Sequence, residues 1–175
     1  SGKGFSIMFR TLTARFALMA ALCLATIAPA QAQFWQCAPY AREISGIDIH
    51  GNANTWWGQA EGRYERGHTP AEGSVLAFEA THRMRVGHVA MVSKMVSERE
   101  VLVDHANWSL IGGRRGHIER GARVIDVSAA GDWSAVRVWY ATIGDMGRTI
   151  YPLHGFIYKH KSVDEQKPEW VIALR

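Results

Sequence analysis

The residue with the clearest potential for chemistry is Cys37, because a thiol can act as a nucleophile. The sequence holds two cysteines, and the other one, Cys23, lies in an apolar N-terminal segment. A helix can begin at or just before Ala38, since the proline that follows is tolerated in a first helical turn. The N–H groups and the dipole of such a helix end favour a thiolate and lower its pKa. The pattern predicts a nucleophilic Cys37, with a buried structural cysteine as the alternative.

A nucleophile of this kind needs a base, and His88 is the best candidate among the eight histidines. It opens an apolar strand after Gly87, and a glycine at that place lets another backbone or a ligand come close. We expect a hairpin with the next strand, which brings Asp104 and Asn107 towards His88. Either side chain can accept from the imidazole and hold its tautomer. Asp104 is favoured because it adds charge stabilisation, and His105 is expected to point away from the face that Asp104 occupies.

The elements that must hold these side chains fall into a helical part and a strand-rich part. One helix is expected to end at Gly46, and Asn54 with Thr55 is expected to cap a second one. Apolar runs between turn residues predict strands at residues 74–78, 88–96, 101–104, 123–127, 135–140 and 156–158. Helices followed by a run of strands predict an α+β fold, with N-terminal helices packed on an antiparallel β-sheet.

Composition and charge limit the classes of partner. The chain has 175 residues, of which 47% are hydrophobic and 21% charged, so one domain can bury a core. Three of the 20 basic residues but none of the 16 acidic ones precede residue 33, so the rest of the chain carries a net charge of +1. This balance argues against a nucleic-acid partner. A single domain is expected over residues 33–175.

The N-terminal residues have the pattern of a secretory signal peptide. Two arginines precede an apolar stretch at residues 16–28, and a cleavage site of small residues follows at Ala30-Gln31-Ala32. Residues 1–7 are interpreted as an artificial extension, so residues 1–32 are excluded from the predicted fold. The apolar stretch is short for a membrane span, and no stable span is expected after cleavage, with a retained anchor as the alternative. We therefore expect an exported protein of the periplasm, the cell wall or the extracellular space.

Five short motifs follow one another in the first two thirds of the chain. They are Gln36-Cys37-Ala38-Pro39-Tyr40-Ala41, Asn52-Ala53 with Trp56-Trp57, Pro70-x-x-Gly73-Ser74-Val75-x-x-Phe78, Gly87-His88-Val89-Ala90-x-Val92, and Asp104 to Trp108. Each motif is common by itself. Their order and spacing resemble the cysteine, histidine-dependent amidohydrolase/peptidase family, abbreviated CHAP.

The resemblance implies a papain-like α+β (CHAP) domain that cleaves amide bonds of bacterial peptidoglycan, with Cys37 as nucleophile and His88 as base. It also implies that Gln36 and the Cys37 backbone N–H form the oxyanion hole. The family commonly carries a glutamate two residues before an asparagine as its third catalytic position. Here Asp104 precedes Asn107 by three residues, so the choice between these two stays open. The chemistry needs no metal or organic cofactor, and it suits either an amidase or an endopeptidase.

Two other classes of function compete with this one. A zinc hydrolase would use His88, Asp104 and His105, although neighbours on one strand point to opposite faces and no His-Glu-x-x-His motif occurs. A non-catalytic cell-wall-binding domain would use tryptophans and arginines, namely Trp56, Trp57, Trp108, Trp133, Trp139 and Trp170 with Arg114, Arg115, Arg120 and Arg123. The substrate groove of the hydrolase has its candidates among the same tryptophans, namely Trp56, Trp57 and Trp108.

Overall fold

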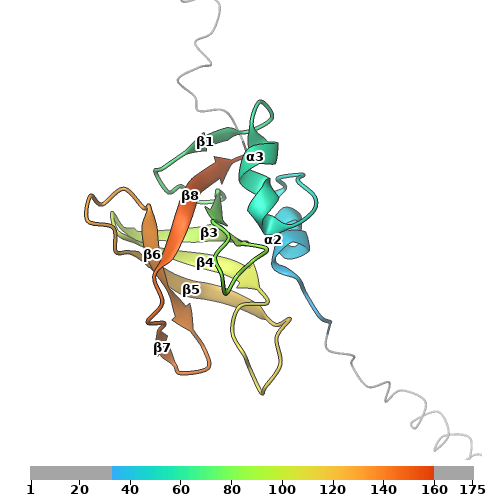
Figure 1. Ribbon diagram of the computed structural model, residues 1–175, viewed down its shortest axis with the longest axis vertical. Helices are drawn as coiled ribbons and strands as arrows, with labels where there is room; N and C mark the ends of the chain where they lie inside the picture. The colour runs from blue at the N-terminus through green and yellow to red at the C-terminus, as the bar shows by residue number, and fades with distance from the viewer. Residues whose placement is uncertain (1–32, 160–175) are drawn as a thin grey trace, which may run out of the picture. The chain divides into compact units, whose positions relative to one another are not determined.

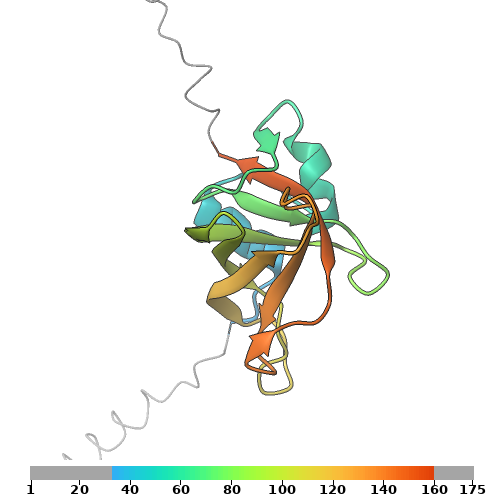
Figure 2. The same cartoon turned by 90° about the vertical axis from the view of Figure 1, so that its left-hand side faces the viewer.

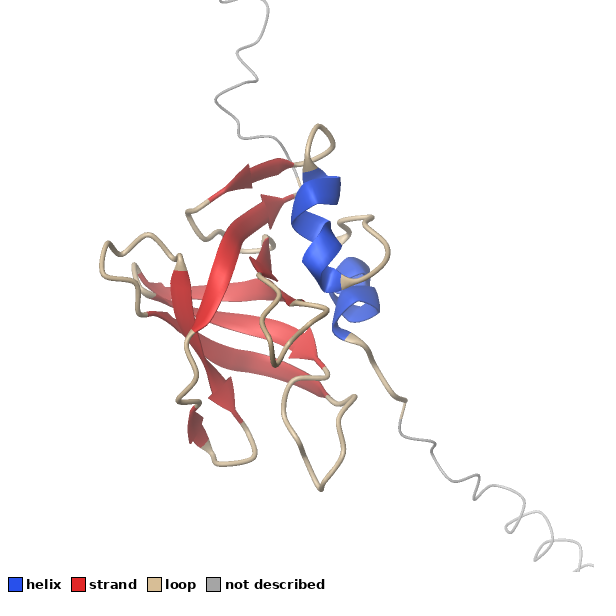
Figure 3. Cartoon of the chain, in the orientation of Figure 1, coloured by secondary structure: helices blue, strands red, loops and turns tan. Residues whose placement is uncertain are grey.

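The computed structural model describes residues 33–159, and Figures 1 and 3 show their helices and strands. The helices are α2 (Cys37–Ser45), the 3₁₀ helix η1 (Ala53–Thr55) and α3 (Trp56–Ala60). The strands are β1 (Glu65–Gly67), β2 (Val75–Phe78), β3 (His88–Ser97), β4 (Glu100–Ala106), β5 (Ile118–Asp126), β6 (Ala135–Tyr140), β7 (Asp145–Met146) and β8 (Tyr151–Tyr158). The predicted signal peptide at residues 1–32 and Trp170 lie outside the described residues.

Six of these strands close into an antiparallel barrel. Neighbouring strands pair in the order β8, β2, β3, β4, β5 and β6, and β8 also pairs with β6, which joins the two ends of the sheet. The short strands β1 and β7 extend from β8 and β6. Figures 1 and 2 show the barrel strands curving around a common interior. Closure pairs backbone groups that an open sheet would leave exposed at its edges.

The barrel corrects the predicted fold class. The prediction of an α+β fold with helices packed on an antiparallel sheet is wrong, because the described domain is mostly β and its two α-helices are short. The difference comes from β8, which the sequence predicts only at residues 156–158. The start of β8 pairs with β6, where Tyr151 faces Val136, and its end pairs with β2, where Ile157 faces Val75. One strand thus bridges two others that are far apart in sequence.

Two apolar cores lie on the two faces of the barrel wall. The interior core takes residues from all six barrel strands, including Ala90 and Val92 of β3. The outer core joins α2, η1 and α3 to the outer face of β2, β3 and β8, where Val89 is a member. Successive side chains of a strand point to opposite faces. The start of β3 therefore has one face in the barrel and one face against the helices.

The two ends of α2 and the hairpin of β3 and β4 agree with the prediction from the sequence. The helix begins at Cys37, and it ends where Gly46 adopts the left-handed conformation with φ 68° and donates its N–H to the carbonyl of Arg42. Strands β3 and β4 pair as a hairpin. Within residues 33–159, no helix has the length and apolar character needed to cross a membrane.

Candidate active site

Cys37 is the first residue of α2, and its thiol lies against strand β3. Burial raises the pKa of the Cys37 thiol above its ordinary value, while hydrogen bonds from the backbone N–H groups of Val89, Ala38 and Cys37 act in the opposite direction. The predicted helix N-terminus is present, but burial outweighs its effect. The side chain therefore rests as a neutral thiol and not as the thiolate that the sequence suggested.

His88 begins β3 and is buried, with 3% of its surface exposed. Its ring packs against Phe78 and Trp108, with ring centroids 5.4 and 4.8 Å away. Burial lowers the pKa of His88 well below its ordinary value, and electrostatic interactions with His105 and with the Arg115 guanidinium lower it further. The imidazole is neutral at neutral pH, which is the form that can accept a proton.

The hydrogen-bond partner of His88 is His105, for which the sequence predicts no catalytic role. Nε2 of His88 and Nδ1 of His105 lie 3.1 Å apart, and His105 is fully buried. Burial lowers the pKa of His105 to about 3, so this ring is also neutral at neutral pH. Within the described residues, Nδ1 of His88 has no hydrogen-bond partner. The second nitrogen of the candidate base is therefore available to another group.

One signal in the sequence could have identified His105. It stands two residues before Asn107, which is the spacing that the resemblance assigns to the third catalytic position. The strand register in the structure agrees with this signal, because Met91 faces Asp104 across β3 and β4 and such partners share a face of the sheet. His88 is three residues from Met91 and lies on the opposite face, together with His105.

Asp104 does not make the expected contact with the imidazole. Its Oδ1 accepts a hydrogen bond from the backbone N–H of Gly121 at 2.8 Å, on the outer side of β4. The three ligands of the zinc alternative, which are Asp104 and the two histidines of the pair, are therefore not gathered. In the part of the chain that the structure describes, no group of three or more His, Cys, Asp or Glu side chains has a metal-binding arrangement.

Asn107 contacts Gln36, the predicted oxyanion residue. Nδ2 of Asn107 donates to Oε1 of Gln36 at 2.8 Å. Asn107 follows β4 with φ 65°, a left-handed conformation that asparagine tolerates better than most residues. Its backbone N–H donates to the carbonyl of His117 at 3.0 Å. Asn107 thus contacts the predicted oxyanion residue Gln36, and not the imidazole of His88 as the sequence suggested.

Gly87 provides the close approach that the sequence predicts beside His88. Its φ is 67°, and a Cβ atom at this position would lie 2.8 Å from the backbone nitrogen of Asn54. The Asn54 N–H donates to the carbonyl of Val86 at 2.8 Å. The group that comes close is therefore the backbone at the start of η1, which anchors the segment in front of β3.

The tryptophans proposed for a substrate groove are mainly packing residues. Trp56 is fully buried among the helices, and Trp108 is 8% exposed in the barrel interior. Trp57 is partly buried, stacks on His154 at 5.8 Å and lies under the guanidinium of Arg66. Trp56 and Trp108 pack in the two cores, so Trp57 is the most exposed of the three groove candidates, and the place of these tryptophans in a substrate groove stays a prediction.

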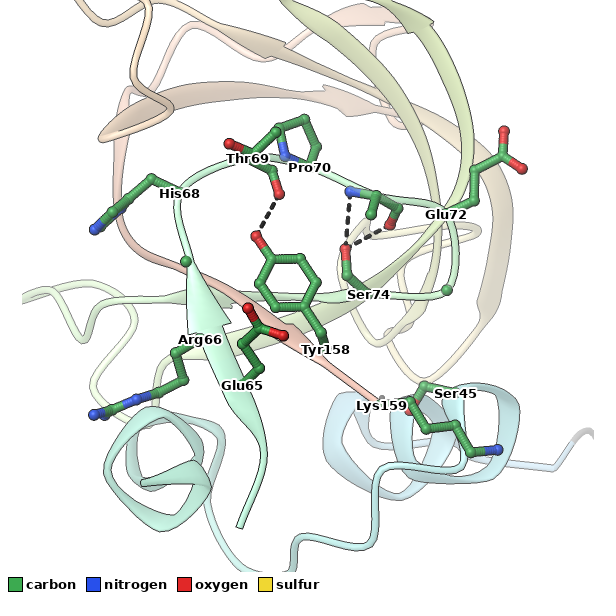
Figure 4. Close-up of a pocket in the computed structure, with 13 residues that line it drawn as sticks. Ser45, Glu65, Arg66, His68, Thr69, Pro70, Glu72, Ser74, Tyr158 and Lys159 are labelled. Carbon is green, nitrogen blue, oxygen red and sulfur yellow. Dashed lines mark hydrogen bonds between the residues drawn. The ribbon is translucent and has the colours of Figure 1, made fainter. Parts of the chain in front are cut away.

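A cavity of about 750 Å³ lies at the opposite end of α2 from Cys37. Figure 4 shows its walls, with Ser45 at the end of the helix and Tyr158 at the end of β8. The hydroxyl of Tyr158 donates to the carbonyl of Thr69 at 2.5 Å. Neither the candidate nucleophile nor the imidazole pair lines this cavity, so cavity size alone does not locate the candidate active site.

Comparison with known families agrees with the motifs in the sequence. Residues 28–107 match the family model described as CHAP domain. The matched segment contains Cys37, both imidazoles of the buried pair, and Asn107 as its last residue. The family predicted from the motifs is therefore confirmed. A search among curated proteins found no match.

Proposed function

Residues 28–107 of this chain belong to the CHAP domain family, and from this premise we propose that the chain is a cysteine amidohydrolase or peptidase that cleaves amide bonds of peptidoglycan. The observation that carries the proposal is the position of the Cys37 thiol. It lies against the backbone N–H of Val89, the residue that follows the candidate base His88. The start of β3 therefore supplies both a contact to the nucleophile and the imidazole.

The proton moves during the reaction, because the thiol and the imidazole both rest in their neutral forms. When Nε2 of His88 carries the hydrogen and donates it to Nδ1 of His105, the lone pair is on Nδ1 of His88. That lone pair accepts the thiol proton. His105 still accepts the Nε2 hydrogen of the imidazolium that forms, and this bond stabilises the charged ring. We assign His105 the third role in place of Asp104 and Asn107.

The chemical steps then follow from these groups. The sulfur of Cys37 attacks the amide carbonyl carbon, and an S–C bond forms as the thiol proton passes to His88. Gln36 Nε2 and the Cys37 backbone N–H donate to the oxyanion, and losing one such donor typically costs about 2.7–4 kcal/mol of barrier. The imidazolium protonates the leaving amine as the C–N bond breaks. Water then loses a proton to the imidazole and releases the acyl group, and the proton returns to sulfur.

Two finer points are part of the proposal. The amide bond cut is either the link between sugar and stem peptide or a peptide bond within the stem or cross-bridge, since a thiol can attack each of them. Export to the periplasm, the cell wall or the extracellular space is proposed from the signal-like residues 1–32, because export brings the protein to the polymer.

Digestion of purified sacculi tests the function. We expect the wild-type protein and the surface control His82→Asn to release soluble fragments, and Cys37→Ala to release none. The masses of the fragments identify which amide is cut. Iodoacetamide should abolish release, whereas loss with a chelator and recovery with zinc would favour the metal alternative. Undiminished release by Cys37→Ala would overturn the proposal, and sacculus binding without release by any variant would favour the wall-binding domain.

A further inference from the structure

We propose that Asn107 is a positioning residue that holds the Gln36 amide with its Nε2 group available to the oxyanion. The inference rests on the proposed function, because it concerns the donor that stabilises the charge formed in that reaction. It gives Asn107 a role that differs from the orientation of the imidazole.

The orientation of Gln36 follows from a single contact. A side-chain amide has an acceptor end and a donor end, and the two cannot face the same partner. Nδ2 of Asn107 donates to Oε1 of Gln36 at 2.8 Å, so the acceptor end is the one that faces Asn107. The NH₂ end of Gln36 is therefore directed away from Asn107. Gln36 precedes Cys37 in the chain and is the N-cap residue of α2, the helix that begins with the nucleophile.

Gln36 needs such a contact because it is exposed. A long exposed side chain has several rotamers, and ordering it costs up to about 2 kcal/mol of conformational entropy. A donor that stabilises an oxyanion works best when it is already oriented before the charge develops. The contact to Asn107, which lies 71 positions further along the chain, supplies that orientation.

Asn107 is itself held by its backbone. Its N–H donates to the carbonyl of His117 at 3.0 Å, and its carbonyl accepts from Nη1 of Arg115 at 3.5 Å. Its side-chain Oδ1 is buried and has no partner among residues 33–159. A buried, unpaired carbonyl oxygen destabilises the fold. The contact with Gln36 is thus the one hydrogen bond that this side-chain amide makes in the described structure.

Orientation of the imidazole does not account for Asn107. Nε2 of His88 is already bonded to Nδ1 of His105, at 3.1 Å. The amide of Asn107 is therefore left with the task of orienting the Gln36 amide.

Asn107→Asp tests the inference without changing the shape of the side chain. A carboxylate can only accept, so it should turn the Gln36 amide around and bind its NH₂ group. Oε1 would then face the oxyanion in place of the donor. We expect kcat for fragment release to fall about 10²- to 10³-fold, the usual effect of losing one oxyanion donor, with KM nearly unchanged. Asn107→Ala, which leaves Gln36 free to rotate, should lose less.

The Asn107 substitutions are repeated in a Gln36→Ala background, to distinguish a role of Asn107 in positioning Gln36 from a role of Asn107 in stabilising the fold. With no amide to orient, Asn107→Asp should lower kcat less than threefold further. The control Asn52→Asp makes the same charge change at an exposed N-cap residue that has no side-chain capping bond, and it should retain activity. Equal losses of kcat in both backgrounds would overturn the inference while leaving the function intact. The proposed function, in contrast, fails if Cys37→Ala remains active or if the wild-type protein releases no fragments.

Discussion

The two buried imidazoles act through one hydrogen bond, because His88 has one ring nitrogen bonded to His105 and the other without a partner among the described residues. Both rings are neutral, so the bond is a contact between a neutral donor and a neutral acceptor. In the proposed mechanism His105 is the acceptor of this bond, and it brings no negative charge to the site. A neutral acceptor lets His88 lose its proton again more easily than a carboxylate would.

Replacement of His105 tests its role. Asparagine can present Oδ1 close to the place of Nδ1, so His105→Asn should keep much of the activity. His105→Leu has no acceptor, and we expect kcat to fall by about 10²- to 10⁴-fold, the range attributed to a positioned acid or base. Steady-state kinetics measure both variants. Equal losses in asparagine and leucine variants of similar thermal stability would contradict the acceptor role.

Arg115 provides a second prediction at this scale. Its positive charge is one of the causes that lower the pKa of His88, after burial and His105. Arg115→Gln should therefore raise that pKa, because the imidazolium no longer has a cation nearby. The acidic limb of the kcat/KM profile should move to higher pH. The matched change Arg114→Gln at the neighbouring exposed arginine should leave the limb in place, and a shift of equal size in both variants would argue against a local charge effect.

At the scale of elements, the start of β3 contributes three neighbouring residues with three different tasks. Gly87 accepts the close approach of the Asn54 backbone, His88 turns into the barrel, and Val89 places its N–H against the Cys37 thiol. The alternation of a strand makes this division possible, since successive residues face opposite sides. Any shift of β3 along its neighbours would displace all three together.

Gly87→Ala tests this anchoring. The new Cβ would lie 2.8 Å from a backbone nitrogen and would also force alanine into φ 67°. We expect the free energy of unfolding to fall by about 2 kcal/mol or more, since left-handed φ alone costs about 1–2 kcal/mol for an L-residue. Gly73→Ala is the control, because its φ is 83° but no atom lies within 4 Å of the added Cβ. Urea unfolding compares them, and equal losses would show that the contact with Asn54 contributes nothing.

At the scale of the whole molecule, closure of the barrel buries the imidazole pair. Strand β8 completes the wall by pairing with both β2 and β6, and the interior core then surrounds His88 and His105. Neither ring can take up a proton in this interior as readily as it does in water. The energetics of folding are therefore linked to pH.

Acidification should destabilise the protein through these two histidines. Their folded pKa values lie below the ordinary value of 6.5, so the unfolded chain binds protons that the folded chain does not. The free energy of unfolding therefore does not change through these two rings above about pH 6.5, and it falls below that pH. The slope of this fall approaches about 1.4 kcal/mol per pH unit for each ring. For His105 the loss continues towards pH 3. Urea unfolding between pH 7 and pH 5 measures the slope, which His105→Asn should reduce and the exposed control His82→Asn should not. A pH-independent unfolding free energy would contradict the prediction.

The sequence by itself determined the features that depend on neighbouring residues. The helix that starts at Cys37, the strand that starts at His88 and the family of the domain all follow from local patterns, and the structure and the family match confirm them. The catalytic roles of these two residues stay predictions. The tertiary structure alone shows the closure by β8, the hydrogen bond between the two buried imidazoles, and the raised pKa of the thiol. These depend on strand register and depth of burial, which arise from contacts between distant segments and leave no mark in a local pattern.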